Sequence, residues 1–210
     1  LVQLSEKPVS YYKEVIRASS FSDEMKEFRV EQFVSWIDKY NLKEKNILEV
    51  GCGRGEYLSI LKQIKASSVH GVEYSKESVS LCEKSRLPVT KGFFGDDNFV
   101  LPRQEYDGFI CLNFMEHWPN PNKVLAHLKE NISDNAVGIV EVPNFDMILK
   151  QGLYSEFISD HLLYFSKETL IFMLNYNGFE VIECSVIWHD YILSAVVRKR
   201  KKIDISLLRS

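Results

Sequence analysis

The stretch "ILEVGCGRGEYL" at residues 47–58 constrains this chain more than any other feature of its sequence. A short apolar run leads into Gly51, Gly53 and Gly55, and Glu49 stands just before the first glycine. Glycines at the end of a buried strand let the backbone turn tightly and approach a ligand closely. The helix that follows presents free N–H groups at its first turn. We therefore expect a ligand at the end of this strand.

Short apolar runs alternate with helical stretches through the middle of the chain. The sequence predicts strands at 46–50, 69–73, 89–94, 107–114 and 136–142, and helices near 11–17, 22–40, 56–65, 76–85 and 121–131. The strands are too short and too continuously apolar for surface helices, which favours burial on both faces of a sheet. Their alternation with helices predicts right-handed βαβ units and a parallel sheet.

The last part of the chain has a different pattern. A helix is expected over 167–177, ended by Gly178, and two further strands are expected at 179–187 and 191–198. The gap between these strands is so short that it can join only antiparallel neighbours. The expected fold class is therefore α/β and Rossmann-like, with a mostly parallel seven-stranded sheet that ends in an antiparallel hairpin and helices on both faces.

Composition excludes several classes of function. The chain has 210 residues, which suits one domain over 1–210. The net charge of -3 and the pI of 6.0 give no support to a nucleic-acid partner. Four scattered cysteines without ligand spacing predict no metal site. The sequence has neither a membrane-length apolar run nor a signal peptide, so we expect a cytoplasmic protein.

Two cofactor classes compete for the glycine loop. The loop reads GxGxG, whereas loops that bind dinucleotides read GxGxxG. Glu49 would repel a pyrophosphate but would attract the ammonium and sulfonium of S-adenosylmethionine. Glu73, 22 residues after Gly51, can accept hydrogen bonds from the ribose of either cofactor. An NAD-linked oxidoreductase is therefore the alternative, together with a binding protein that has lost catalysis.

The same residues carry a family resemblance. "ILEVGCGRGEYL" with "VHGVEYS", then "YDGFICLNFMEHWPNPNKVL" and "GFEVIE", resembles the motifs of class I S-adenosylmethionine-dependent methyltransferases over residues 40–200. The resemblance implies methyl transfer to a small acceptor, with S-adenosyl-L-homocysteine (SAH) as the product. It also implies a lid within residues 1–40 and an acceptor-side insertion at 143–166.

The resemblance assigns cofactor contacts residue by residue. At the methionine end it places Glu49, Gly51, Cys52 and Gly53, with Asn113 near the transferred methyl group. Around the adenosine it places Glu73 on the ribose, Tyr74, Phe93 and Phe94 at the adenine, and Gly92 or Asp96 near the adenine amine.

A narrower resemblance concerns the aromatic insertion. "EVP…DHLLYFSKETL" with "GFEVIE" and His189 is similar to sugar C-methyltransferases that act on nucleotide-linked keto-sugars. It implies His161 as the general base with Asp160 orienting it. Acceptor contacts are expected from Tyr154, Tyr164 and His189.

The expected roles of the other histidines come from their positions in the predicted elements. His117 is expected to be either structural or substrate-facing, His70 structural, and His127 exposed on a helix. Ile158 and Ser159 differ from the motif of the sugar enzymes. O-methylation of a carbohydrate or phosphate-bearing precursor, such as a nucleotide-linked or phosphorylated sugar, is therefore slightly favoured over C-methylation.

Overall fold

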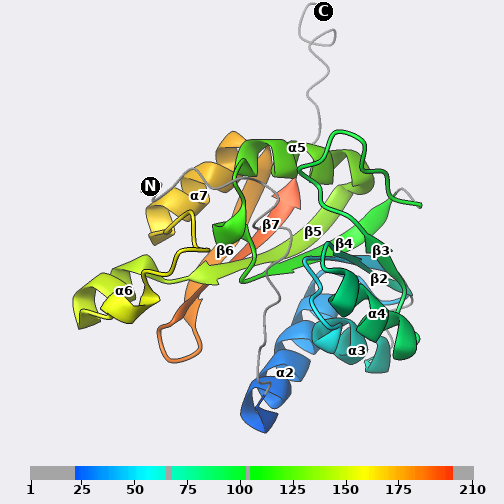
Figure 1. Cartoon of the computed structure of the whole chain (residues 1–210), viewed down its shortest axis with the longest axis horizontal. Coiled ribbons are helices and arrows are strands. Elements are labelled where there is room, and N and C mark those ends of the chain that lie inside the picture. The colour runs from blue at the N-terminus through cyan, green and yellow to red at the C-terminus, as the bar shows by residue number, and fades with distance from the viewer. Residues whose placement is uncertain (1–21, 65–67, 103–104, 201–210) are drawn as a thin grey trace, which may run out of the picture.

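The computed structural model describes residues 22–64, 68–102 and 105–200, and its centre is one seven-stranded sheet (Figure 1). The strands are β1 (Asn46–Val50), β2 (Ser68–Glu73), β3 (Val89–Lys91), β4 (Tyr106–Leu112), β5 (Ile132–Pro143), β6 (Phe179–Ile187) and β7 (Ile192–Lys199). Their order is β3-β2-β1-β4-β5-β7-β6. Strands β1 to β5 pair in parallel, and β7 pairs antiparallel with both β5 and β6. The predicted fold class, including the terminal hairpin, is confirmed.

Six α-helices and two short 3-10 helices accompany the sheet in the described ranges. They are α2 (Asp23–Lys39), α3 (Glu56–Gln63), α4 (Lys76–Lys84), η1 (Met115–His117), α5 (Pro121–Asn131), α6 (Phe145–Gln151), η2 (Tyr154–Glu156) and α7 (Lys167–Tyr176). Side-chain caps fix where several of them begin, because Ser22, Ser75, Asn120 and Ser166 each accept a hydrogen bond from a first-turn N–H.

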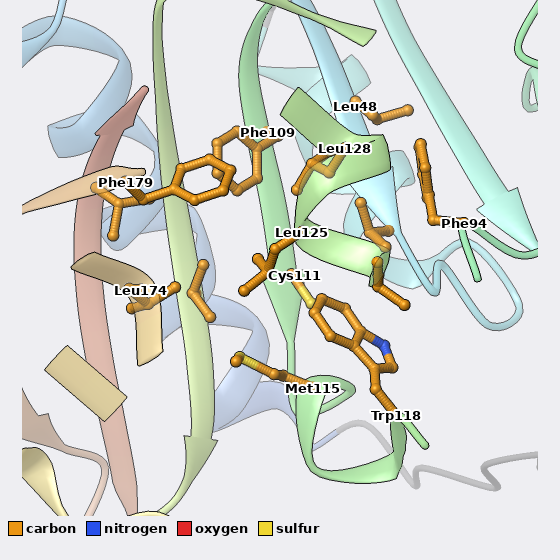
Figure 2. Packing of buried hydrophobic residues seen from close by; sticks show 14 of the residues in the cluster. Leu48, Phe94, Phe109, Cys111, Met115, Trp118, Leu125, Leu128, Leu174 and Phe179 are labelled. Atoms are coloured by element: carbon orange, nitrogen blue, oxygen red, sulfur yellow. The ribbon is translucent and has the colours of Figure 1, made fainter. Parts of the chain in front are cut away.

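Two apolar clusters hold the helices on the two faces of the sheet. Helices α2, α3 and α4 cover one face, where Phe33, Trp36 and Leu58 are buried. Helices α5 and α7 cover the other face, where Leu128 and Leu174 pack around Phe109 and Phe179 (Figure 2). Each ring pair and aliphatic chain removed from water stabilises the sandwich of layers.

The element boundaries differ from prediction at two strands. Strand β3 ends at Lys91, and the following Phe93 and Phe94 are buried in a loop that folds back onto the core. Their apolar signal thus reflects core packing in a loop. Strand β5 begins at Ile132, before the predicted residue 136, because Tyr106 pairs with Ile132 ahead of a bulge.

The helix predicted at 11–17 and most of the predicted 1–40 lid lie outside the described residues. None of the helices in the described ranges is long and apolar enough to cross a membrane. The carboxyl ends of β1, β2, β4 and β5 meet at one edge of the sheet, where α/β folds place their ligands.

Candidate functional site

The glycine loop after β1 has the backbone that only glycine adopts easily. Gly51, Gly53 and Gly55 have φ values of 78°, 53° and 86°, all in the left-handed region. A Cβ on Gly51 would lie 2.4 Å from the ring of Phe114, so this position has no room for a side chain. Gly55 is also the residue that caps α3, which leaves the first turn of that helix open to the site.

A small cavity of about 130 Å³ lies against this loop. It is lined by Glu49, Gly51, Cys52, Gly53, Arg54, Glu56, Tyr57, Leu112 and Asn113. In the described part of the chain, Glu49 Oε2 and Asn113 Oδ1 are buried and have no hydrogen-bond partner. Both atoms are acceptors, so the cavity calls for a ligand that carries hydrogen-bond donors or positive charge.

The electrostatics of Glu49 agree with that requirement. The pKa of Glu49 is raised well above its ordinary value of 4.5, first because burial desolvates the carboxylate and then because Glu56 is nearby. A cation beside Glu49 would reverse this shift. The site is therefore short of positive charge.

Glu73 ends β2 and organises the loop. Its Oε2 accepts a hydrogen bond from Gly53 N at 2.9 Å, and its Oε1 accepts one from Ser75 N at 2.7 Å. Each carboxylate oxygen has a second lone pair that can accept from a ligand hydroxyl. Glu73 thus lies where a ribose was expected, next to the loop that holds the opposite end of the ligand.

The residues expected at the adenine have different surroundings. Tyr74 packs at the edge of the core with Lys91 Nζ 6.0 Å from its ring centre, and Phe93 is 8% exposed. The ring of Phe94 is 0% exposed and packs against Phe99 and His127. The ring of Phe94 is thus inaccessible in this structure, and its contact with the adenine stays a prediction.

His127 was predicted to be exposed, but its side chain is only partly exposed. Its Nδ1 lies 2.8 Å from the carbonyl oxygen of Phe94, and its ring packs against Phe99. His70 has the structural role that was expected. It lies within β2, 2.8 Å from Thr90 Oγ1, and its pKa is lowered by desolvation.

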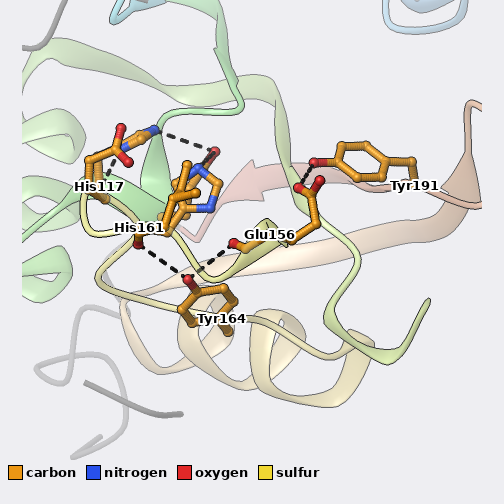
Figure 3. A network of polar contacts seen from close by, with 8 residues as sticks. His117, Glu156, His161, Tyr164 and Tyr191 are labelled. Atoms are coloured by element: carbon orange, nitrogen blue, oxygen red, sulfur yellow. Dashed lines mark hydrogen bonds and ion pairs between the residues drawn. The ribbon is translucent and has the colours of Figure 1, made fainter. Parts of the chain in front are cut away.

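A second polar group lies just beyond β4. Glu116 and His117 in η1 and His161 in the insertion are 1%, 7% and 8% exposed. The rings of His117 and His161 are 4.8 Å apart, and each Nε2 faces Glu116 Oε1, at 3.8 Å and 4.0 Å respectively. Figure 3 shows the side chains of His117 and His161 close to each other. The structure thus brings His117 and His161 together.

The acidic partners in this cluster are not the expected ones. Asp160 was expected to orient His161, but its backbone oxygen and its carboxylate lie 2.8 Å and 3.6 Å from His117 Nδ1. A carboxylate oxygen of Glu116, a residue that the sequence analysis missed, lies 4.0 Å from His161 Nε2. Only the fold reveals this pairing, because the two residues are far apart in sequence and no motif marks Glu116.

The insertion at 143–166 forms a loop whose two ends lie side by side. Its two ends are joined by a bridge between Asn144 and Phe165, and Leu162 N and Leu163 N donate to Glu116 O at 2.8 Å and 3.1 Å. Phe145, Phe157 and Tyr164 pack on one another within it. Part of its aromatic content therefore serves its own packing.

The three residues expected to contact an acceptor lie in different environments. Tyr164 is buried and donates to the backbone oxygens of Glu156 and Ile158 (Figure 3). Tyr154 is 81% exposed on η2. His189 is exposed at the tip of the β6–β7 hairpin, 3.6 Å from Glu24. Tyr154 and His189 have no polar or ring contact with the histidine cluster within the described residues.

Helix α2 adds a buried ion pair that the sequence analysis also missed. Arg29 Nη1 lies 2.6 Å from Glu141 Oε2, and both side chains are 0% exposed. Gln32 and Ser194 also bind Glu141, and the guanidinium lies over the rings of Phe28 and Tyr57. Because Asn113 N donates to Glu141 O, this pair connects α2 to the cavity.

Comparison with known families decides the family of this chain. A family model described as a methyltransferase domain matches residues 23–184, which include the glycine loop, Glu73 and η1. The chain belongs to the methyltransferase domain family.

Individual relatives of this methyltransferase domain are distant. A ubiquinone biosynthesis O-methyltransferase from Pseudomonas savastanoi is 28% identical over 98 residues, which cover 44% of this chain and 42% of that protein. One from Dechloromonas aromatica is 31% identical over 99 residues, with the same coverage. The matched segment thus spans less than half the length of these curated relatives.

Solved structures show the same fold at low sequence identity. A putative sarcosine dimethylglycine methyltransferase from Galdieria sulphuraria aligns with a TM-score of 0.71 at 13% identity, over 90% of this chain and 95% of that one. Magnesium protoporphyrin IX methyltransferase from Synechocystis, solved with bound SAH, aligns with a TM-score of 0.65 at 16% identity, over 87% and 90%.

Proposed function

We propose that this chain transfers a methyl group from S-adenosylmethionine to the oxygen of a small acceptor. The observation that carries the proposal is the pair of buried acceptor atoms, Glu49 Oε2 and Asn113 Oδ1, in the cavity at the glycine loop. The ammonium of S-adenosylmethionine supplies the donors and the charge that both atoms need. A pyrophosphate supplies neither, which disfavours an NAD-linked oxidoreductase.

The residues that contact the cofactor in this proposal lie at the carboxyl-terminal edge of the sheet. Glu49, Gly51, Cys52, Gly53 and Asn113 hold the methionine end, and Glu73 holds the ribose, with Tyr74 and Phe93 on the adenine side. Between these ends the loop backbone must approach the ligand closely, which its three left-handed glycines permit. S-adenosylmethionine supplies an electrophilic methyl carbon on a sulfonium.

The acceptor end lies at the cluster of Glu116, His117 and His161. Methyl transfer is an in-line displacement with a neutral leaving group, so it needs alignment above all. A hydroxyl acceptor must also lose its proton, and His161 is the candidate to receive it. Phe114 connects the two halves of the site, because its ring packs between Gly51 and His117.

The similarity to ubiquinone biosynthesis O-methyltransferases supports transfer to oxygen. The acceptor class is proposed from the sequence as a carbohydrate or a phosphate-bearing precursor. Hydroxylated aromatic rings are the competing class, because those relatives are named for ubiquinone biosynthesis.

Calorimetry with SAH and with NAD tests the cofactor assignment. We expect SAH to bind with one site per chain and NAD to show no saturable binding. NAD binding without SAH binding would refute the proposal in favour of an oxidoreductase. Binding of neither ligand would indicate a domain that has lost its cofactor.

A substrate screen tests the acceptor. The purified chain is incubated with S-adenosylmethionine and with nucleotide sugars, sugar phosphates or dihydroxylated aromatic compounds, and SAH release is followed. We expect turnover with a sugar-containing class. Turnover with the aromatic class alone would correct the acceptor while leaving the methyltransferase assignment intact.

A further inference from the structure

We infer that Glu116, His117 and His161 bind a divalent transition-metal cation that in turn holds the acceptor oxygen. This inference rests on the proposed function and deepens it at the acceptor end. It differs from the expectation of no metal site, which came from cysteine spacing alone. The three residues are the group of potential metal ligands found in the described ranges, and all three are buried.

The fold brings the three ligands together without any sequence motif. Glu116 and His117 are adjacent in η1, directly after the end of β4. His161 arrives from the insertion, whose Leu162 and Leu163 N–H groups both bind the backbone oxygen of Glu116. The backbone oxygen of Glu116 in η1 thus fixes where His161 lies relative to the Glu116 carboxylate.

The hydrogen bonds behind His117 set its tautomer. Its Nδ1 lies 2.8 Å from Asp160 O, and because a carbonyl oxygen can only accept, Nδ1 carries the proton. In the neutral ring, Nε2 then presents a lone pair toward Glu116 Oε1. A histidine that binds a metal nearly always donates its other N–H to such a carbonyl or carboxylate. Asp160 offers both groups to the same nitrogen.

The distances suit a cation with only small side-chain adjustments. The Glu116 Oε1 to Nε2 distances are 3.8 Å and 4.0 Å, and the three ligand atoms all lie within 4.8 Å of one another. A point equidistant from three atoms so spaced lies about 2.5 Å from each, against about 2.0–2.2 Å for zinc bonds to histidine and carboxylate. Contraction by a few tenths of an ångström, within rotamer freedom, closes the site.

The ligand set selects the class of metal. Two imidazoles and one carboxylate suit Zn²⁺, Fe²⁺, Co²⁺ or Mn²⁺, whereas Mg²⁺ and Ca²⁺ prefer all-oxygen sites. Three protein ligands also leave coordination positions open for a substrate. The arrangement agrees, because two imidazoles and one carboxylate face one another in a space of low exposure.

The bound cation gives the cluster a defined chemical task. The acceptor hydroxyl binds at an open position, where the cation lowers its pKa and the proton leaves to water. The acceptor oxygen then bonds to the methyl carbon as the carbon–sulfur bond breaks. The electron pair of that bond stays on sulfur, so the products are a methyl ether, SAH and one proton. His161, named above as the proton acceptor, acts in this scheme as a metal ligand instead, and the proton goes to water.

Metal titration of the purified full chain tests the inference. The protein is stripped with a chelator, dialysed, and titrated with Zn²⁺ and Mn²⁺ by calorimetry, and Co²⁺ loading is followed by visible absorption. We expect one equivalent of metal per chain. Glu116→Gln and His161→Gln should each lose binding by more than 100-fold, and Asp160→Asn should lose less than about 10-fold, because the backbone oxygen of residue 160 still accepts from His117 Nδ1. His70→Gln, at a histidine outside the cluster, should bind as the wild type does.

Two readouts keep this test separate from that of the proposed function. SAH affinity should be the same with and without metal, and unchanged in Glu116→Gln. Absence of stoichiometric metal binding in the wild type, or undiminished binding in both ligand variants, would overturn the inference and leave SAH binding untouched. Failure of the wild type to bind SAH would instead refute the proposed function. If Glu116→Gln does not fold by circular dichroism, His161→Gln carries the comparison.

Discussion

At the scale of single residues, Glu73 is the side chain that we propose as the link between the ribose of the cofactor and the glycine loop. It already accepts hydrogen bonds from Gly53 N and Ser75 N, so a ribose would complete its coordination. We expect Glu73→Ala to weaken SAH binding by about 1–3 kcal/mol, because the ribose hydroxyls of bound SAH then have no acceptor. Calorimetry measures this change. Glu77→Ala, at an exposed glutamate on α4, is the control, and equal affinities in the two variants would place the ribose elsewhere.

The sequence could predict the residues of the glycine loop because their backbone demands are local. The left-handed φ values of Gly51, Gly53 and Gly55 follow from spacing that can be read directly. Glu116 and Arg29 could not be predicted in this way. Each owes its role to a partner that only tertiary structure supplies, His161 and Glu141 respectively, and a charged residue in a polar stretch gives no sign of burial.

At the scale of elements, α2 is held to the sheet by more than its apolar face. Arg29 and Glu141 form a fully buried pair, so removing the cation alone leaves a buried negative charge. We expect Arg29→Met to lower the free energy of unfolding by about 3–5 kcal/mol. The double variant Arg29→Met/Glu141→Gln should recover part of that loss. Guanidinium unfolding followed by circular dichroism measures both variants.

The matched control for this prediction is Lys39, a basic residue of α2 whose ion pair is exposed. Lys39 pairs with Glu183 on the surface, where both side chains are about half exposed. Lys39→Met should change stability by no more than about 1 kcal/mol, because exposed ion pairs contribute little. A cost for Arg29→Met as small as that for Lys39→Met would show that the buried pair does not anchor α2.

Elements with a strong periodic signal could be predicted closely, and loops that pack into the core could not. Strand β1 and the β6–β7 hairpin match their predicted ranges within a residue, because apolar continuity and turn length determine them. The run at 92–94 was predicted as strand because two phenylalanines carry the same signal in a buried loop. The acceptor-side role of the insertion stays a prediction, since part of its aromatic content packs internally.

At the scale of the whole molecule, the buried carboxylate of Glu49 couples stability, pH and the cofactor. The pKa of Glu49 is raised well above the ordinary 4.5, mainly by desolvation. At a pH between the unfolded and the folded pKa, the folded chain without cofactor therefore holds a proton that the unfolded chain has lost. Stability from this group is therefore greatest below about pH 4.5 and falls as pH rises toward the folded pKa, by at most about 1.4 kcal/mol per pH unit.

Bound SAH should remove this loss, because its ammonium beside Glu49 favours the carboxylate and lowers the pKa. The rise in melting temperature caused by saturating SAH should then grow as the pH rises above about 4.5, until Glu49 is ionised in both states. For a domain of this size, the growth should be roughly 3–5 °C per pH unit at its steepest. Differential scanning fluorimetry at fixed SAH excess measures it. Glu49→Gln should bind SAH more weakly and show no such growth, whereas a pH-dependent gain that persists in Glu49→Gln would assign the proton to another group.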